Sequence, residues 1–133
     1  MIHGVGTDIA AVSRLAALYD KHGERATEKL LAPAEFEAFD RASDKGRFLA
    51  KRFAAKEAFG KALGIGVAAP ATLPNLAVDH DELGKPFFAY APELAALMHE
   101  RKLVAHLSIS DEKNYATAFV VIERLSLDSP TSR

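Results

Sequence analysis

Two carboxylates and one lysine carry the chemistry that the sequence offers most directly. Glu57 and Lys61 lie in the segment 45–61, which holds six basic residues and this one acid. Residues four apart share a face of a helix, so these two side chains are expected to point the same way. Asp8 ends an apolar segment near the N-terminus. Two carboxylates with phosphate oxygens and waters suit an octahedral Mg²⁺, and a lysine can neutralise a phosphate that the metal does not reach. The pattern favours a site that binds a phosphate-bearing polyanion.

Each of these residues also has a purely structural interpretation. Asp8 can be a solvated strand-end carboxylate or a helix N-cap. Glu57 can pair with Lys61 on a helix surface, which stabilises by only about 0.2–0.5 kcal/mol. The neighbourhood weakens both alternatives, because alanine at positions 50, 54, 55 and 58 leaves the helix surface thin and open to a ligand or a second backbone.

Glycine, histidine and serine positions narrow the kind of site. Gly64 and Gly66 follow the basic segment, so they form no P-loop, although glycines there allow phosphate to approach the backbone amides. The five histidines have no close metal-binding spacing, which argues against zinc. His106 can donate to a phosphate or be an ordinary sheet histidine. Ser108 and Ser110 lack a nucleophile elbow, which argues against a serine hydrolase.

Composition limits the protein class. The chain has 133 residues, a formal net charge of −1 and no cysteine. These values predict one domain, no disulfide or thiolate chemistry and no nucleic-acid partner. No signal peptide or membrane-length apolar run is visible, so a cytoplasmic location with no membrane partner is expected.

Periodicity predicts a single α+β domain over residues 1–124 and a flexible tail at 125–133. A mostly antiparallel sheet is expected around a long central helix. Ser13 is expected to cap the first helix, Ser43 or Asp44 to cap the long basic helix, and Gly64 to end it. The expected elements are a strand at 2–10, helices at 13–21, 24–31, 33–41 and 45–63, strands at 75–79 and 85–90, a helix at 92–101, and strands at 104–110 and 115–124.

Four segments in sequence order resemble the motifs of the holo-[acyl-carrier-protein] synthase family of 4′-phosphopantetheinyl transferases. They are Gly4–Ile9 with Arg14, Phe48–Gly64, Gly84–Pro86, and Ser108–Glu112 followed by Tyr115-Ala116. Two positions depart from the family pattern. Asp111 stands where many members carry histidine, and Ile65 stands where many carry threonine in a Gly-Thr-Gly.

This resemblance implies a 4′-phosphopantetheinyl transferase-like fold and a Mg²⁺-dependent reaction. The enzyme would move the phosphopantetheine arm of coenzyme A onto a serine of apo acyl carrier protein and release adenosine 3′,5′-bisphosphate. Asp8 and Glu57 would ligate the metal, and Lys61 would hold a phosphate oxygen. The serine proton would pass to Glu57 or to a water on the metal, and the residues do not choose between them.

The resemblance also implies residues that bind the substrates. Arg52 and His106 are candidates for the phosphates of coenzyme A. Gly64 to Gly66 and Lys85-Pro86 would frame the nucleotide.

The same resemblance implies a homotrimeric ring with each active site at a subunit interface. The acidic carrier protein would meet Arg14, Lys21 and Arg25 on the first helix, where their spacing of i, i+7 and i+11 puts them on one face. Two other classes remain open. One is a catalytically silent module that binds coenzyme A or a nucleotide, and the other is an oligomer-forming structural protein whose basic helix is only a solvated face.

Overall fold

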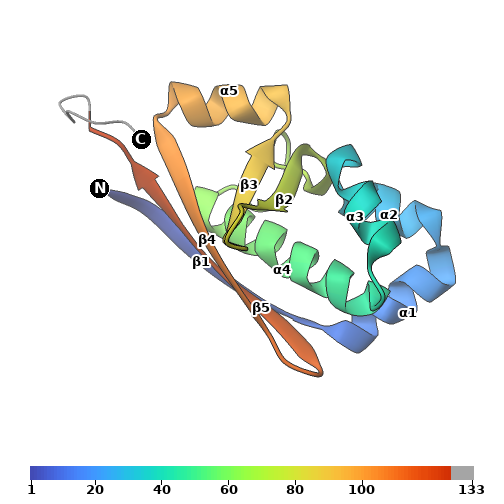
Figure 1. Cartoon of the computed structure of the whole chain (residues 1–133). Helices are drawn as coiled ribbons and strands as arrows, with labels where there is room; N and C mark the ends of the chain where they lie inside the picture. The colour runs from blue at the N-terminus through green and yellow to red at the C-terminus, as the bar shows by residue number, and fades with distance from the viewer. Residues whose placement is uncertain (127–133) are drawn as a thin grey trace.

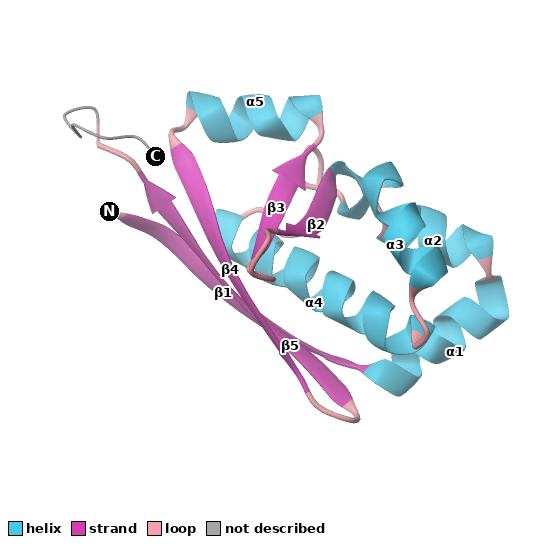
Figure 2. Ribbon diagram, viewed as in Figure 1, coloured by secondary structure: helices cyan, strands magenta, loops and turns pink. Residues whose placement is uncertain are grey.

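The computed structural model describes residues 1–126, and its elements follow an α+β order (Figures 1 and 2). The strands are β1 (Ile2–Ala11), β2 (Leu76–His80), β3 (Pro86–Tyr90), β4 (Leu103–Asp111) and β5 (Tyr115–Arg124). The helices are α1 (Val12–His22), α2 (Glu24–Leu30), α3 (Phe36–Arg41), α4 (Lys45–Leu63) and α5 (Pro92–Glu100), with 3₁₀ turns η1 (Pro33–Glu35) and η2 (Leu73–Asn75).

A three-stranded antiparallel sheet in the order β1-β5-β4 forms one layer of the molecule. Thr7 lies opposite Phe119, and Asp8 lies opposite Ala118. Because successive strand residues point to opposite faces, the sheet has a buried face and an exposed face. Gly6, Ala10, Ala118 and Val120 lie on the buried face, whereas Val5, Ile9 and Phe119 lie on the exposed face.

Helix α4 packs along the buried face of the sheet, as Figure 1 shows. The Asp44 side chain caps it by accepting from the Arg47 amide at 3.0 Å, and Gly64 ends it with a φ of 98°. Its small buried side chains, such as Ala54 and Ala58, let the sheet approach closely. The predicted start and end of this helix are both confirmed.

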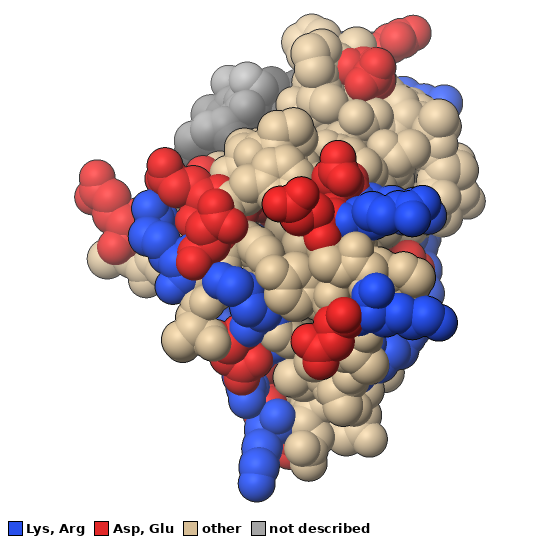
Figure 3. Space-filling model, turned by 90° about the vertical axis from the view of Figure 1, so that its right-hand side faces the viewer, with Lys and Arg blue, Asp and Glu red and all other residues tan. Residues whose placement is uncertain are grey.

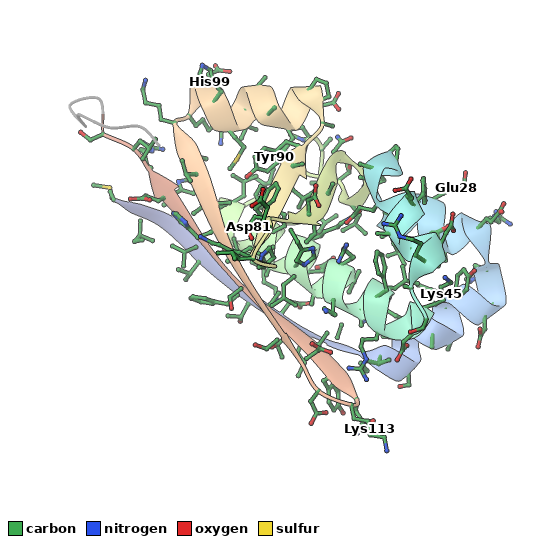
Figure 4. All side chains as sticks on the ribbon, viewed as in Figure 1. Glu28, Lys45, Asp81, Tyr90, His99 and Lys113 are labelled. Atoms are coloured by element: carbon green, nitrogen blue, oxygen red, sulfur yellow. The ribbon has the colours of Figure 1, made fainter. Side chains whose placement is uncertain are left out.

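The β2–β3 hairpin packs on another side of α4, and α5 packs on β3 and β4. Phe59 of α4 packs edge-on against Phe88 with ring centroids 5.0 Å apart, and its ring lies 5.8 Å from that of Tyr90. Burial raises the pKa of Tyr90 to about 12. Figure 4 shows Tyr90 on the α4 side of the hairpin and Asp81 at its turn. The hairpin therefore completes the core on the side of α4 away from β1.

The fold class is confirmed, and the local differences have identifiable causes. Helix α1 begins at Val12, so Ser13 is not its N-cap, because the Val12 amide instead donates to the Asn114 carbonyl at 2.9 Å. The helix expected at 33–41 starts as a 3₁₀ turn and becomes α-helical at Phe36. Of the predicted tail, residues 127–133 lie outside the described part, and the Leu125 amide donates to the Lys102 carbonyl at 2.9 Å. Within residues 1–126, no helix combines the length and apolar character of a membrane span.

Candidate active site

The structure brings the three predicted chemical residues to the contact between β1 and α4. Lys61 donates from Nζ to the Thr7 carbonyl at 2.9 Å and to Asp8 Oδ1 at 3.3 Å. Asp8 lies on the face of β1 that packs against α4, and its side chain is largely shielded, with 17% exposed. Lys61 keeps 54% of its side chain exposed. The exposed ammonium can reach a phosphate in solvent, and the shielded Asp8 carboxylate would then favour another cation in its place.

Glycines on β1 make this contact possible. A Cβ atom at Gly6 would lie 2.1 Å from the Ala58 carbonyl oxygen, and one at Gly4 would lie 2.0 Å from that of Ala62. Any larger residue would therefore push β1 away from α4. The Gly4–Asp8 motif seats the strand on the helix and carries Asp8 toward Glu57.

The electrostatics of Glu57 reflect a second carboxylate and two cations close to it. Desolvation raises the pKa of Glu57, the nearby charge of Asp8 raises it further, and Lys61 and Arg14 lower it. A carboxylate whose ionisation is disfavoured by a second carboxylate nearby forms a suitable environment for a cation. No group of three or more Asp, Glu, His or Cys side chains suited to a metal is present among residues 1–126. A metal bound between Asp8 and Glu57 would therefore need further ligands from substrate and water, as Mg²⁺ commonly has.

An open depression of about 460 Å³ adjoins this site. Asp8 and Lys61 line it together with the hydroxyl-bearing residues Ser108, Ser110 and Thr117. The depression therefore extends from the β1–α4 contact to the exposed face of the sheet. A phosphate-bearing ligand would find one cation and several hydrogen-bond donors there.

The predicted nucleotide residues lie elsewhere in the chain. Lys85 and Pro86 belong to the β2–β3 hairpin, on the side of α4 away from β1. His106 is on the exposed face of β4 and lies 3.1 Å from Glu123 Oε1 through its Nε2. Gly64 and Gly66 form the turn after α4, and the Gly66 amide donates back to the Gly60 carbonyl at 3.0 Å. A single chain therefore does not gather these residues around Asp8.

Arg52 is held in a buried charge cluster that the sequence did not indicate. Its Nε lies 3.0 Å from Glu35 Oε2, and its guanidinium stacks over the Phe48 ring. Burial lowers its pKa, whereas Glu35 and Asp79 raise it. Lys56 completes the cluster. A contact between Arg52 and coenzyme A stays a prediction, and any such contact would have to share the guanidinium with Glu35.

Asp111, one of the two departures from the family pattern, fastens the β4–β5 turn to α4. Arg47 donates to Asp111 Oδ2 at 2.7 Å and to the Glu112 and Lys113 carbonyls at 2.6 and 3.2 Å. Lys113 marks this turn in Figure 4. At this position, aspartate therefore binds a neighbouring arginine of the same chain.

The three residues predicted to meet the carrier protein do not share one helix. Gly23, with φ 55° and ψ −129°, interrupts the helical conformation between α1 and α2. The helical repeat therefore does not extend from Arg14 and Lys21 to Arg25. Arg14 lies over the Phe53 ring, and its charge lowers the pKa of Glu57. Lys21 is exposed in the last turn of α1.

Arg25 instead lines a groove of about 370 Å³ at the α1–α2 side, which we call the basic-rimmed groove. Its apolar members are Leu18, Ala26, Leu30 and Leu73, and its basic members are His22, Arg25 and Lys29. Figure 3 views the molecule from the side on which α1, α2 and α3 lie and shows basic and acidic side chains interspersed there. Basic side chains on this side therefore form small clusters among acidic ones, and the rim of the basic-rimmed groove is one of these clusters.

Comparisons with known proteins identify the family of the chain. A family model for the 4′-phosphopantetheinyl transferase superfamily matches residues 4–120. The holo-[acyl-carrier-protein] synthase of Dechloromonas aromatica (strain RCB) is 58% identical over 123 residues, which cover 92% of this chain and 98% of that protein. The corresponding protein of Azoarcus sp. (strain BH72) is 57% identical over 123 residues, with the same coverage.

Solved structures show the same similarity. The holo-[acyl-carrier-protein] synthase of Neisseria meningitidis superposes with a TM-score of 0.90 at 42% identity, over 93% of this chain and 100% of that one. The Bacillus anthracis protein, solved in complex with CoA (3′,5′-ADP), gives a TM-score of 0.79 at 33% identity, over 94% of this chain and 99% of that one. The chain therefore belongs to the 4′-phosphopantetheinyl transferase superfamily. Within that superfamily, these relatives are holo-[acyl-carrier-protein] synthases, which confirms the family predicted from the sequence motifs.

Proposed function

We propose that this chain transfers the 4′-phosphopantetheine group of coenzyme A to a serine of apo acyl carrier protein. The observation that carries the proposal is the meeting of Asp8, Glu57 and Lys61 where β1 packs on α4, in a chain whose relatives are named for this reaction. The alternative of a silent binding module is disfavoured because all three chemical residues are present. Nothing in the described chain favours a purely structural role.

We propose Mg²⁺ as the cofactor, held by Asp8 and Glu57. The donor set fits, since two hard carboxylate oxygens with substrate phosphate and water are characteristic of Mg²⁺ sites. The charge of Asp8 disfavours ionisation of Glu57, and this adds to the fit because a divalent cation would relieve it. When bound, the metal would neutralise charge on the diphosphate during transfer.

The residues of the chain then have separate tasks in the reaction. The serine oxygen forms a bond to the β-phosphorus of coenzyme A, and the bond from that phosphorus to adenosine 3′,5′-bisphosphate breaks. Lys61 neutralises a phosphate oxygen as charge develops. Glu57 is proposed to accept the serine proton. In the metal-free chain its pKa is raised by desolvation and by Asp8. The charge of Arg14 limits that rise in the pKa of Glu57.

A homotrimer with shared active sites is part of the proposal. Apolar side chains stay uncovered on the face of the sheet away from α4, including Val5, Ile9 and Phe119 with 56%, 62% and 46% exposed. Figure 1 shows no described element over that face. Such a face in a small domain suits burial against another subunit. A neighbour could also supply the Lys85-Pro86 or His106 side of the nucleotide site, which one chain leaves far from Asp8. A three-fold ring uses one such heterologous contact three times.

The basic-rimmed groove is proposed to receive the acyl carrier protein. An apolar floor with a basic rim suits an acidic partner that presents an apolar side chain from a helix. Lys21 and Arg14 would continue the contact along α1 toward Glu57. A cytoplasmic location, where such carriers are modified, stays a prediction.

The direct test is incubation of the protein with coenzyme A, Mg²⁺ and apo acyl carrier protein, followed by intact-mass measurement of the carrier. Addition of one phosphopantetheine group, lost when Mg²⁺ is chelated, supports the proposal. A second arm uses a carrier with its acceptor serine replaced by alanine. Unchanged carrier mass with wild-type protein, or modification of the alanine carrier, would contradict it.

A further inference from the structure

Lys56 is the most buried charged side chain that the proposed reaction does not use. It is 1% exposed and lies one residue before Glu57 on α4. Its Nζ donates to Glu35 Oε1 at 2.5 Å, to the Leu30 carbonyl at 2.8 Å and to the Leu73 carbonyl at 3.1 Å. All three donors of the ammonium are therefore directed to fixed partners.

Two of these partners belong to the basic-rimmed groove. Leu30 is the last residue of α2 and Leu73 the first of η2, and both line the groove. The segments meet at Lys56, although more than 40 residues of chain separate them. Leu30 is at a helix C-terminus, where the last carbonyls lack partners within the helix and a cation is favourable. One ammonium thus joins both walls of the groove from inside the protein.

Glu35 fixes Lys56 in turn. Its carboxylate accepts from the Ala32 amide at 2.9 Å and from the Val78 amide at 2.9 Å, in addition to pairing with Lys56 and Arg52. Burial lowers the pKa of Lys56 to about 8, Glu35 opposes this change, and Arg52 adds to it. Burying such a cluster seldom stabilises more than packed apolar residues would, so its retention suggests a geometric role.

We propose that Lys56 is a positioning residue for carrier recognition, holding α2 and η2 at the spacing that opens the basic-rimmed groove. This inference rests on the proposed function, because it assigns the groove to the acyl carrier protein. Lys56 touches neither substrate in this arrangement and acts through the backbone at Leu30 and Leu73. Because Lys56 extends from the helix that carries Glu57, the same contacts set the distance from the docked carrier to the catalytic carboxylate.

The test compares Lys56→Met with the wild-type protein in two measurements. Methionine keeps a long flexible side chain but donates no hydrogen bonds. The KM for apo acyl carrier protein is expected to rise about tenfold, which corresponds to about 1.4 kcal/mol of binding free energy. The KM for coenzyme A should stay unchanged. Amide hydrogen exchange of the free protein should accelerate at residues 26–31 and 73–76.

A matched control separates positioning from general loss of stability. Leu94→Ala removes a fully buried side chain of α5, outside the groove, and should lower the denaturant midpoint of unfolding clearly. At a temperature where both variants are folded, Leu94→Ala should leave the carrier KM and the exchange of 26–31 near wild type. An equal rise of carrier KM in both variants would overturn the proposal, as would an unchanged carrier KM in Lys56→Met.

The two measurements also separate this proposal from the proposed function. Hydrogen exchange needs no carrier and therefore tests the positioning role of Lys56 by itself. Unchanged exchange in Lys56→Met refutes that role. A wild-type protein without transfer activity refutes the proposed function. Should Lys56→Met fail to fold, Lys56→Gln is the second variant, because its shorter side chain carries only two N–H donors and cannot hold Glu35, Leu30 and Leu73 together. The same rise in carrier KM and the same faster exchange are expected for it, and wild-type values would overturn the proposal.

Discussion

At the scale of single residues, the proposed chemistry depends on the charge interactions among Asp8, Glu57 and the cations near them. We expect Glu57→Gln to lower transfer activity by at least about a hundredfold, because it removes both a metal ligand and the proposed base. Steady-state transfer at saturating Mg²⁺ measures this. Far-UV circular dichroism should stay that of wild type, and near-wild-type turnover would contradict the two-carboxylate site.

The stability of the same variant should move in the opposite direction. The folded-state pKa of Glu57 is raised by desolvation and by Asp8, so the folded protein disfavours its ionised form. By linkage, ionised Glu57 lowers the free energy of unfolding at pH values above its raised pKa. This destabilisation disappears as the pH falls through that pKa. In metal-free buffer at pH 7, Glu57→Gln should unfold at an equal or higher denaturant midpoint than wild type. A clear loss of stability at pH 7 would show that ionised Glu57 is favourably paired.

Arg14 is expected to set the acid limb of the pH profile. Its charge lowers the pKa of Glu57, so Arg14→Met should raise that pKa. Activity that needs ionised Glu57 is lost as the pH falls, and the acid limb of kcat/KM should therefore move to higher pH. The control is Lys21→Met, which removes an exposed cation that does not appear among the influences on Glu57. Identical limbs for both variants would remove Arg14 from the electrostatics of the site.

Sequence spacing could predict some of these residues and not others. Glu57 and Lys61 follow from helical periodicity, and Asp8 from its place at the end of a glycine-containing strand. Lys56 looked like one more cation of an exposed basic helix, yet it is 1% exposed. Its partner Glu35 lies 21 residues away on a different element, and only tertiary packing brings the two together. Local patterns carry no information about such pairs.

At the scale of elements, the approach of β1 to α4 decides whether Asp8 and Glu57 can act together. Gly6→Ala should destabilise the protein by about 3 kcal/mol, since the new Cβ would lie 2.1 Å from the Ala58 carbonyl and the backbone must shift. It should also lower transfer activity more than its loss of stability explains, because Asp8 is two residues away. Denaturant unfolding and transfer kinetics on the folded protein measure the two effects.

Thr7→Ala is the control for the stability effect at the same strand. Thr7 points to the exposed face, so this change should alter the unfolding free energy by less than about 0.5 kcal/mol. If Gly6→Ala is as stable as Thr7→Ala, the close packing of strand on helix is not needed.

Element boundaries were predictable where local chemistry decides them. Asp44 and Gly64 define the ends of α4 through a side-chain cap and a left-handed φ, both of which the sequence indicated. The start of α1 was not predictable from Ser13, because the partner of the Val12 amide is Asn114, a residue of the distant β4–β5 turn. The break between α1 and α2 at Gly23 likewise moved Arg25 out of the predicted shared face and into a groove.

At the scale of the whole molecule, one chain places the residues proposed for the site in two separate regions. Asp8, Glu57 and Lys61 lie at β1 and α4, whereas Lys85 and Pro86 lie on the hairpin beyond α4. A second chain that packs against the uncovered apolar face of the sheet could bring its own Lys85 and Pro86 close to Asp8. Activity should therefore fall on dilution below the assembly constant, with light scattering reporting the loss of trimer in parallel.

Mixed oligomers test the shared site most directly. Asp8→Asn and Lys85→Ala are each expected to be inactive or nearly so, and co-refolding them at equal amounts should restore activity. A junction between two subunits is intact when an unaltered Asp8 meets an unaltered Lys85 of the neighbour. If the two variants assemble in random order, this occurs at about a quarter of the junctions. Asp8→Asn mixed with Glu57→Gln is the matched control. Those two residues come from the same chain, so no arrangement rebuilds a complete site and no activity should return. Restoration in both mixtures, or in neither, would contradict a site divided between Asp8 of one subunit and Lys85 of the next.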